Sequence, residues 1–229
     1  MNSPNVVLYT SIFGGYDPIV DVRQYHRPNL KFVCFTDRPE YNLGWDIKET
    51  PLNKELRFTT TMTARSIKTQ PHKHLPLCDI NVYVDANKPV KDIDAVLKMC
   101  QEVHESKEID AIFVKHHQRD TLVEEMQEIL IWQRDNEEIV KNQVAGYFDE
   151  GYADDTPLIV TSMQVRKTNS PTMIELMDTW WNEIRTKSCR DQLSFPYVIW
   201  KCNFKKYRLI QVDDREAMFN NYPHGRKIR

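Results

Sequence analysis

The chain has 229 residues, of which 41% are hydrophobic and 28% are charged, and its formal net charge is only -2. This balance is typical of a globular protein, and the length fits a single domain over residues 1–229. A near-neutral charge argues against the broad basic face of a nucleic-acid-binding protein. An anionic substrate would therefore need a local cluster of cations, or a bound metal ion, to neutralise it.

The cysteines, at positions 34, 78, 100, 189 and 202, are odd in number and form no CxxC motif. This pattern argues against a disulfide framework and a zinc site, and it favours a reducing compartment. The first residues lack the basic start and long apolar stretch of a signal peptide. No segment approaches the roughly 18 apolar residues of a membrane span. We therefore expect a cytoplasmic protein without a membrane span, with peripheral membrane association left open.

Short apolar runs predict buried strands, and amphipathic or capped segments predict helices between them. In chain order we expect strands 6–10, 31–35 and 45–48, helix 53–69, strand 80–84, helix 92–103, strand 109–114, helix 121–144, strand 158–165, a helix from 170 to 184, helix 195–200 and strand 207–212. Residues 220–229 form a polar, basic tail. Because strands alternate with helices, the predicted class is α/β, with a mostly parallel sheet flanked by helices.

Ligands of open α/β sheets bind beyond the carboxyl ends of the strands. The predicted strands end in polar groups: Thr10 with Ser11, Thr36 with Asp37, Asp85 with Ala86 and Asn87, and His116 with His117. Asp85 is the most informative, because an acid directly after a buried strand can hold a hard divalent cation that also binds diphosphate oxygens. Such a metal offsets the charge that develops on a leaving group. The same carboxylate could instead cap the next turn, and spacing alone does not decide.

Four sequence motifs occur in this order along the chain: 8–17 (LYTSIFGGYD), 32–37 (FVCFTD), 83–87 (YVDAN) and 190–198 (RDQLSFPYV). Together they resemble the glycosyltransferase-like domain shared by plant mucilage-related and turgor-regulation-defect proteins and by bacterial polysaccharide-locus proteins. The resemblance covers nearly the whole chain. It implies a GT-A-like, Rossmann-type fold, a nucleoside-diphosphate sugar donor, and Mn2+ or Mg2+ as cofactor.

The implied reaction is transfer of a hexose or deoxyhexose from the nucleotide sugar to a glycan or lipid-linked acceptor, in polysaccharide biosynthesis. The metal motif of that fold is D-x-D, whereas this chain has Asn87 in the third position. An amide oxygen ligates a hard cation without adding charge, which puts strict metal dependence in question. The resemblance implies Asp85 and Asn87 as metal ligands.

The late histidine that completes the metal site in some GT-A enzymes is similar in position to His224. The resemblance therefore adds His224 to the metal ligands, with Lys227 beside the diphosphate under a tail that closes over it. A disordered basic tail is the alternative.

Further donor contacts are expected on the helix before the metal strand and on the glycine loop. Arg65, Lys68 and His72 are spaced to share one helical face, and they match the family's A-R-x-x-K-x-x-P-H pattern; a solvated basic face is the alternative. The loop glycines allow close approach of a nucleotide, on whose base an aromatic ring can stack, although a tight turn also explains them. The full expected donor set is Thr10, Ser11, Phe13, Gly14, Tyr16, Asp37, Arg65, Lys68, Asp85, Ala86 and Lys227.

The segment that begins at Asp191 is the predicted catalytic element. If the enzyme inverts the anomeric centre, Asp191 is the candidate base; if it retains configuration, Gln192 or Asp191 lines the reacting face of the sugar. A helix N-cap at Asp191 is the structural alternative. Substrate contacts are expected from residues with imidazole or guanidinium groups, namely His72, His116, His117 and Arg119. The acidic pairs 124–125 and 137–138 are interpreted as solvated helix surface.

Two other functions compete with sugar transfer. A non-catalytic module that binds nucleotide sugars or glycans is suggested by Asn87 in place of a second aspartate. A hydrolase is less favoured, because the chain has no HExxH zinc motif and no apolar span.

Overall fold

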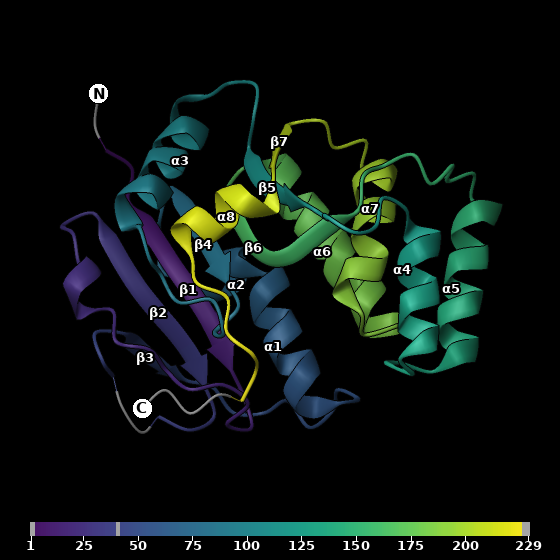
Figure 1. Cartoon of the computed structure of the whole chain (residues 1–229), viewed down its shortest axis with the longest axis horizontal. Helices are drawn as coiled ribbons and strands as arrows, with labels where there is room; N and C mark the ends of the chain where they lie inside the picture. The colour runs from purple at the N-terminus through teal and green to yellow at the C-terminus, as the bar shows by residue number, and fades with distance from the viewer. Residues whose placement is uncertain (1–2, 40–41, 226–229) are drawn as a thin grey trace.

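The computed structural model describes residues 3–39 and 42–225 and is built around one seven-stranded sheet (Figure 1). The strand order is β3-β2-β1-β4-β6-β5-β7. The strands are β1 (Val6–Ile12), β2 (Leu30–Thr36), β3 (Asp46–Glu49), β4 (Ile80–Val84), β5 (Ala111–Lys115), β6 (Ile159–Lys167) and β7 (Tyr207–Ile210). Neighbouring strands pair in parallel, except that β6 runs antiparallel to both β4 and β5. The predicted α/β class with a mostly parallel sheet is therefore confirmed.

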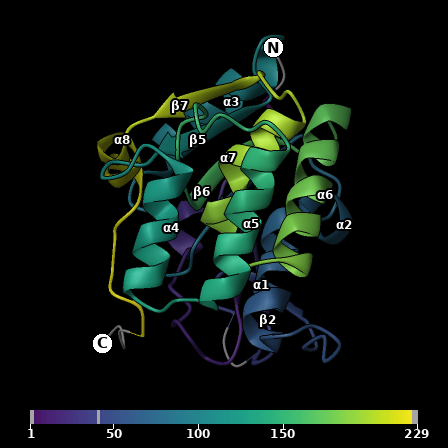
Figure 2. The same cartoon turned by 90° about the vertical axis from the view of Figure 1, so that its right-hand side faces the viewer.

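Helices pack against the sheet, and several of them lie on the side that faces the viewer in Figure 2. They are η1 (Arg23–Tyr25), α1 (Thr59–Thr69), α2 (Pro71–His74), α3 (Ile93–Glu105), α4 (Leu122–Ile131), α5 (Glu137–Asp149), α6 (Pro171–Thr186), α7 (Asp191–Lys201) and α8 (Val212–Met218). Within the described residues, no helix combines the length and the apolar character that crossing a bilayer requires.

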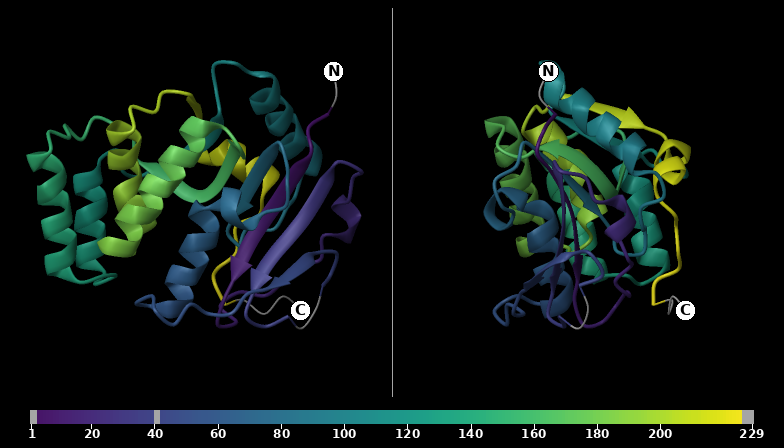
Figure 3. Two further views of the ribbon diagram at one scale, coloured as in Figure 1. Left: turned by 180° about the vertical axis from the view of Figure 1, so that it is seen from behind. Right: turned by 90° about the vertical axis from the view of Figure 1, so that its left-hand side faces the viewer.

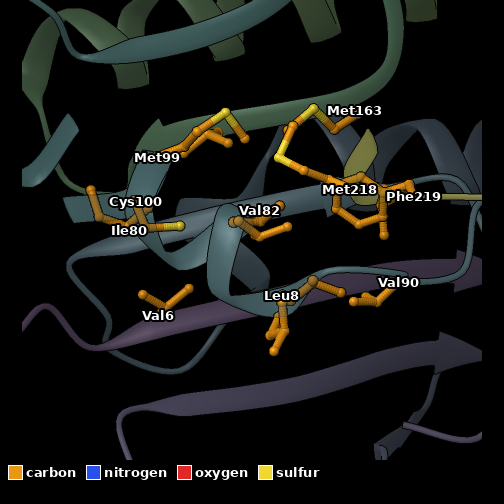
Figure 4. Packing of buried hydrophobic residues seen from close by; sticks show 14 of the residues in the cluster. Val6, Leu8, Ile80, Val82, Val90, Met99, Cys100, Met163, Met218 and Phe219 are labelled. Carbon is orange, nitrogen blue, oxygen red and sulfur yellow. The ribbon is translucent and has the colours of Figure 1, made fainter. Parts of the chain in front are cut away.

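The alternation of side chains along the central strands gives the sheet two apolar faces. On one face Leu8 and Val82 belong to a cluster that includes residues of α3 together with Met218 and Phe219 (Figure 4). On the other face Tyr9, Tyr83 and their neighbours pack against α1. A third cluster joins β5 and β6 to α4, α5, α6 and α7. Burial of both faces is the reason that these strands read as continuous apolar runs.

The helix predicted over 121–144 is wrong in its length, because two helices occupy this region. Helix α4 ends at Ile131, Gln133 adopts a left-handed conformation with φ 49°, and Asn136 caps α5 by accepting a hydrogen bond from the Ile139 amide. The Asn136 cap followed by two glutamates is a helix-start signal within the predicted helix. The resulting α4–α5 hairpin stands at the end of the molecule away from β3 (Figures 1 and 3).

Three other boundaries differ from the sequence prediction. Helix α1 begins at Thr59 rather than at 53, after Phe58 in the left-handed region. Helix α7 begins at Asp191, four residues before the predicted 195. The last strand ends at Ile210, and the unpredicted helix α8 follows it. The early start of α7 places Asp191 and Gln192 on its first turn, which decides the geometry of the site.

Candidate active site

A buried ionic cluster joins α1, β6 and α7. The Lys68 side chain is only 1% exposed, and its Nζ donates to Asp191 Oδ2 at 2.6 Å and to Thr161 Oγ1 at 3.1 Å. Arg65, one turn earlier on α1, places Nη1 3.0 Å from the same Asp191 oxygen. Thr161 also donates its hydroxyl to that oxygen at 2.8 Å. The fold thus brings the predicted donor-binding cations onto the predicted catalytic aspartate.

Asp85 lies at the open edge of this cluster. Its Oδ1 accepts a hydrogen bond from the Tyr83 hydroxyl at 2.9 Å and lies 4.0 Å from Lys68 Nζ. The Asp85 side chain is 26% exposed, in contrast to the nearly fully buried Lys68. The carboxylate that ends the central strand therefore keeps one side toward the buried cations and another toward solvent.

The cluster holds Asp191 as a permanent anion. Burial alone would raise the pKa of the Asp191 carboxyl, but Arg65 and Lys68 outweigh burial and hold that pKa well below its usual range. Burial lowers the pKa of Lys68, and Asp191 opposes this. A general base works best with a pKa near the operating pH. This environment suits an anchor for cations better than a proton acceptor, and the side chain does not act as the helix cap considered above.

Buried groups behind the cluster fix the backbone of both helices. Arg166 is fully buried on β6 and donates from Nη1 to the Lys68 carbonyl at 3.1 Å and from Nε to Asn81 Oδ1 at 2.9 Å. It also donates to the Tyr9 hydroxyl. The Trp180 indole donates to the Asp191 carbonyl at 3.0 Å. Satisfied buried networks of this kind are rigid, so the ionic cluster is pre-organised.

A cavity opens on the opposite side of Asp85. It lies between β1, β2, the loop at 18–22 and the segment 84–90. Its walls are mostly apolar, and its polar members include Thr10, Asp85 and Lys88. Thr10 is 3% exposed, and its Oγ1 has no hydrogen-bond partner in the described structure. An apolar cavity with a few polar groups is typical of a small-molecule site, and three predicted donor residues, Thr10, Asp85 and Ala86, line it.

The glycine loop borders this cavity and is held by Asp37. Gly14 and Gly15 have φ values of 68° and 67°, in the left-handed region that favours glycine. The Gly14 amide donates to Asp37 Oδ1 at 2.9 Å. Tyr16 is largely exposed, whereas Phe13 is buried in the core. Asp37 therefore shapes the loop through a backbone bond, and its predicted contact with the nucleotide stays a prediction.

The C-terminal segment 219–225 crosses this region as a strap; 226–229, and with them Lys227, lie outside the described residues. The amide of Tyr222 donates to the Asn87 carbonyl at 2.9 Å, and Asn87 Nδ2 donates to the Tyr222 carbonyl at 2.7 Å. At the end of the strap His224 Nδ1 lies 3.0 Å from Asp17 Oδ2, and its ring contacts that of Tyr16. The structure therefore pairs His224 with Asp17.

The groups near Asp85 are chemically suited to a divalent ion. Asp85 offers a partly exposed carboxylate, and the buried Oδ1 of Asn87 has no hydrogen-bond partner among the described residues. Residues 3–39 and 42–225 contain no group of three His, Cys, Asp or Glu side chains placed to hold a metal ion. Mg2+ typically takes one or two carboxylates plus substrate phosphates and waters, so such a group is not needed.

Two of the predicted substrate histidines have other partners. His72 does not continue the face of α1, since α1 ends at Thr69; its Nε2 lies 3.2 Å from Asp178 Oδ1. His116 is buried, and its Nδ1 accepts from the amides of Gln118 and Arg119. Burial, aided by the Arg119 charge, lowers the pKa of His116 to about 4. His116 is thus a neutral ring that holds a turn, with the ring of the next histidine, at position 117, stacked against it.

Arg119 and Glu125 form an ion pair that sequence reasoning missed. Arg119 Nη2 lies 2.9 Å from Glu125 Oε2, which also accepts from Gln192 Nε2 at 2.9 Å. Glu125 is 2% exposed, so its interpretation as solvated surface is wrong. The signal was present, because positions 122, 125 and 129 share one face of α4, and Leu122 and Ile129 are core residues.

The chain is similar to a known protein family and to solved structures. The family model described as TOD1/MUCI70, glycosyltransferase-like domain, matches residues 48–224. No curated protein matches the chain. Among solved structures it is similar to the mannosyltransferase PcManGT from Pyrobaculum calidifontis in complex with GDP-Man and Mn2+, at 13% identity and a TM-score of 0.45, over 92% of this chain and 55% of that one. It is also similar to the WbbM bifunctional glycosyltransferase, at 10% identity and a TM-score of 0.47, over 91% of this chain and 39% of that one. The chain therefore spans 55% or less of these proteins.

Proposed function

The chain belongs to the TOD1/MUCI70 glycosyltransferase-like domain family, and we propose that it transfers a hexose or deoxyhexose from a nucleoside-diphosphate sugar to a glycan or lipid-linked acceptor. The observation that carries this proposal is the position of Asp85. Its carboxylate lies between an apolar cavity with an unpartnered hydroxyl and a buried cluster of cations. A nucleotide sugar has this division, with a flat base at one end and an anionic diphosphate next to the reacting sugar.

In this proposal the cavity receives the nucleoside, and the Thr10 hydroxyl gains from the nucleoside the hydrogen bond that it lacks in the described structure. Asp85 and Asn87 would hold Mn2+ or Mg2+, and a bound ion there would supply positive charge to offset that of the departing diphosphate. The free Oδ1 of Asn87 supports this assignment, because a buried acceptor without a partner is costly unless a ligand uses it. We propose that His224 leaves Asp17 and binds the metal, and that Lys227 contacts the diphosphate.

The ionic cluster is proposed to position the sugar. Asp191 holds Arg65 and Lys68 in fixed places, so neither cation must be reorganised when charge develops during transfer. The partly exposed Arg65 can then donate to donor oxygens, a task that suits a guanidinium. Asp191 and Gln192 line the reacting face of the sugar. The contacts of His117 and Arg119 with the donor sugar or the acceptor stay proposals of the same kind. So do the cytoplasmic location and the part in polysaccharide biosynthesis.

A donor screen tests the proposal. The protein is incubated with uridine and guanosine diphosphate sugars, with Mn2+, with Mg2+ or with a chelator, and both thermal shift and release of the nucleoside diphosphate are measured. We expect one nucleotide class to stabilise the fold and to be slowly hydrolysed in the presence of metal. Absence of both stabilisation and hydrolysis across the panel would contradict the proposal.

A non-catalytic module that binds nucleotide sugars is the second candidate. It is favoured by the neutral Asn87, whose amide group is bonded to the strap. The same screen separates the two functions, because such a module would be stabilised by the nucleotide without releasing the diphosphate from its sugar.

A further inference from the structure

Glu125 is a buried carboxylate that the proposed function does not yet use. It lies on the first turn of α4, and its Oε2 accepts from Arg119 Nε at 3.0 Å and from Gln192 Nε2 at 2.9 Å. Arg119 also contacts His116 Nε2 at 3.1 Å and lies 3.8 Å from Glu128. Glu125 therefore connects the turn after β5 to the first turn of α7.

The ion pair keeps Glu125 in place as a hydrogen-bond acceptor. Burial outweighs Arg119, the Gln192 amide and Arg190, so the pKa of the Glu125 carboxyl is raised above its usual value, while its hydrogen-bond partners Arg119 and Gln192 are both donors. A buried carboxylate that lost these partners would be strongly unfavourable. This arrangement uses an arginine and a glutamate to hold a single amide, and packing alone does not require it.

The partner decides which end of the Gln192 amide faces where. A primary amide has two N–H donors at one end and a carbonyl acceptor at the other. An ionised carboxylate accepts only, so the NH2 group must face Glu125, and the carbonyl Oε1 must point away from it. A flipped amide would bring two acceptor oxygens together, which is unfavourable in a buried site.

Gln192 directly follows Asp191, whose carbonyl is fixed by Trp180. Both residues lie on the first turn of α7, and Asp191 is the aspartate of the cation cluster. We propose that Glu125 is a positioning residue, which orients the Gln192 amide so that its carbonyl oxygen faces the sugar-transfer site. This inference rests on the proposed function. In sugar transfer the anomeric centre gains positive charge in the transition state, so an oxygen facing it stabilises that state and an NH2 group would oppose it.

A double-mutant cycle tests the proposal, with Glu125→Met, Gln192→Met and the double variant; methionine has the length of glutamate but offers no oxygen acceptor. Glu128→Met is the matched control, because Glu128 lies one turn further along α4 and faces Arg119. We expect E125M to lower kcat about 10- to 100-fold and to change the donor KM by less than about threefold. The double variant should be no slower than Q192M alone, because Glu125 acts through Gln192. Multiplied losses in the double variant, or E125M activity equal to that of E128M, overturn the proposal.

Nuclear magnetic resonance of the Gln192 side-chain amide gives a readout that does not depend on activity. The NH2 signal is assigned by its absence in Q192M, and hydrogen exchange is measured in the native protein. We expect one slowly exchanging amide proton, with protection kept in E128M and lost in E125M, which has no oxygen acceptor at that position. A Gln192 amide that exchanges like a free one in the native protein overturns the inference, even if transfer is observed. If the native protein turns over no donor, the proposed function fails, while the amide protection still tests the contact with Glu125.

Discussion

The cavity beside β1 and the ionic cluster between α1 and α7 lie on either side of Asp85 but differ in how their polar atoms are satisfied. In the cluster, one oxygen of Asp191 has three donors, from Arg65, Lys68 and Thr161, although Arg65 Nε has no partner among the described residues. In the cavity, Thr10 Oγ1 has no partner within that part of the chain, and neither has Asn87 Oδ1. Polar groups that are complete before a ligand arrives build the scaffold, whereas incomplete ones indicate where a ligand binds.

The largest expected effect comes from removing the aspartate at the centre of the ionic cluster. Asp191→Asn leaves Arg65 and Lys68 with only the more distant Asp85 as an anion and should lower the free energy of unfolding by about 3 to 5 kcal/mol. The Asp191 pKa is depressed in the folded state, so its stabilisation is present above the unfolded pKa of about 4 and is lost as pH falls below it. Urea unfolding should show the difference from the native protein narrowing below about pH 4. Asp94→Asn, on an exposed carboxylate, is the control.

Substitutions of Asp85 test whether the cavity and the ionic cluster belong to one site. Asp85→Ala should lower metal-dependent donor turnover about 100- to 1000-fold, because the leaving diphosphate loses its metal. Stability should change by no more than about 1 to 2 kcal/mol, since the side chain is partly exposed and gives up one bond from Tyr83. Asp85→Asn keeps the shape and should show nearly the same loss of turnover. Full turnover in D85A, measured as nucleoside diphosphate release, would mean that the donor binds elsewhere.

The sequence predicted the end of β4 better than the partners of Asp191. Position 85 follows a buried apolar run, and local pattern is enough to place such a residue at the edge of a sheet. The contact of Lys68 with Asp191 depends on α1 and α7 both packing near β6, which no local pattern contains. Thr161 and Arg166 lie on β6, whose antiparallel direction the alternation of strands and helices does not reveal.

The strap could not be placed from sequence for a related reason. Residues 219–225 carry no helical or strand period, and their position depends on backbone bonds to the segment 87–90. Glu125 is a different case, because its spacing with Leu122 and Ile129 was readable. A charged residue on the apolar face of a helix indicates a buried ion pair. This indication is stronger than that of an adjacent acidic residue, which favours a solvated surface.

Two threonines provide a matched test of complete and incomplete partners. Thr10→Val should raise stability by about 1 to 3 kcal/mol, because it removes a buried hydroxyl that has no partner, but it should weaken nucleotide binding about 5- to 10-fold. Thr161→Val removes a hydroxyl with two partners and should cost about 1 to 3 kcal/mol of stability. Unfolding curves and calorimetry with uridine and guanosine diphosphates measure both. Equal stability losses in the two variants would remove the distinction on which the donor cavity rests.

The smallest effects concern the strap, where the direction of the change is more informative than its size. His224 and Asp17 form a pair at the end of the strap, so either substitution should change stability by at most about 1 kcal/mol. If His224 leaves Asp17 to join the metal, the pair competes with donor binding, and the apparent affinity is reduced by the fraction of molecules in the paired state. Asp17→Asn should then tighten binding of the nucleotide in Mn2+ by about two- to fivefold, whereas His224→Ala should weaken it by a similar factor. Titrations with and without Mn2+ measure both variants. If the pair of His224 and Asp17 only holds the glycine loop, both substitutions should change nucleotide affinity in the same direction, because each would release the same contact.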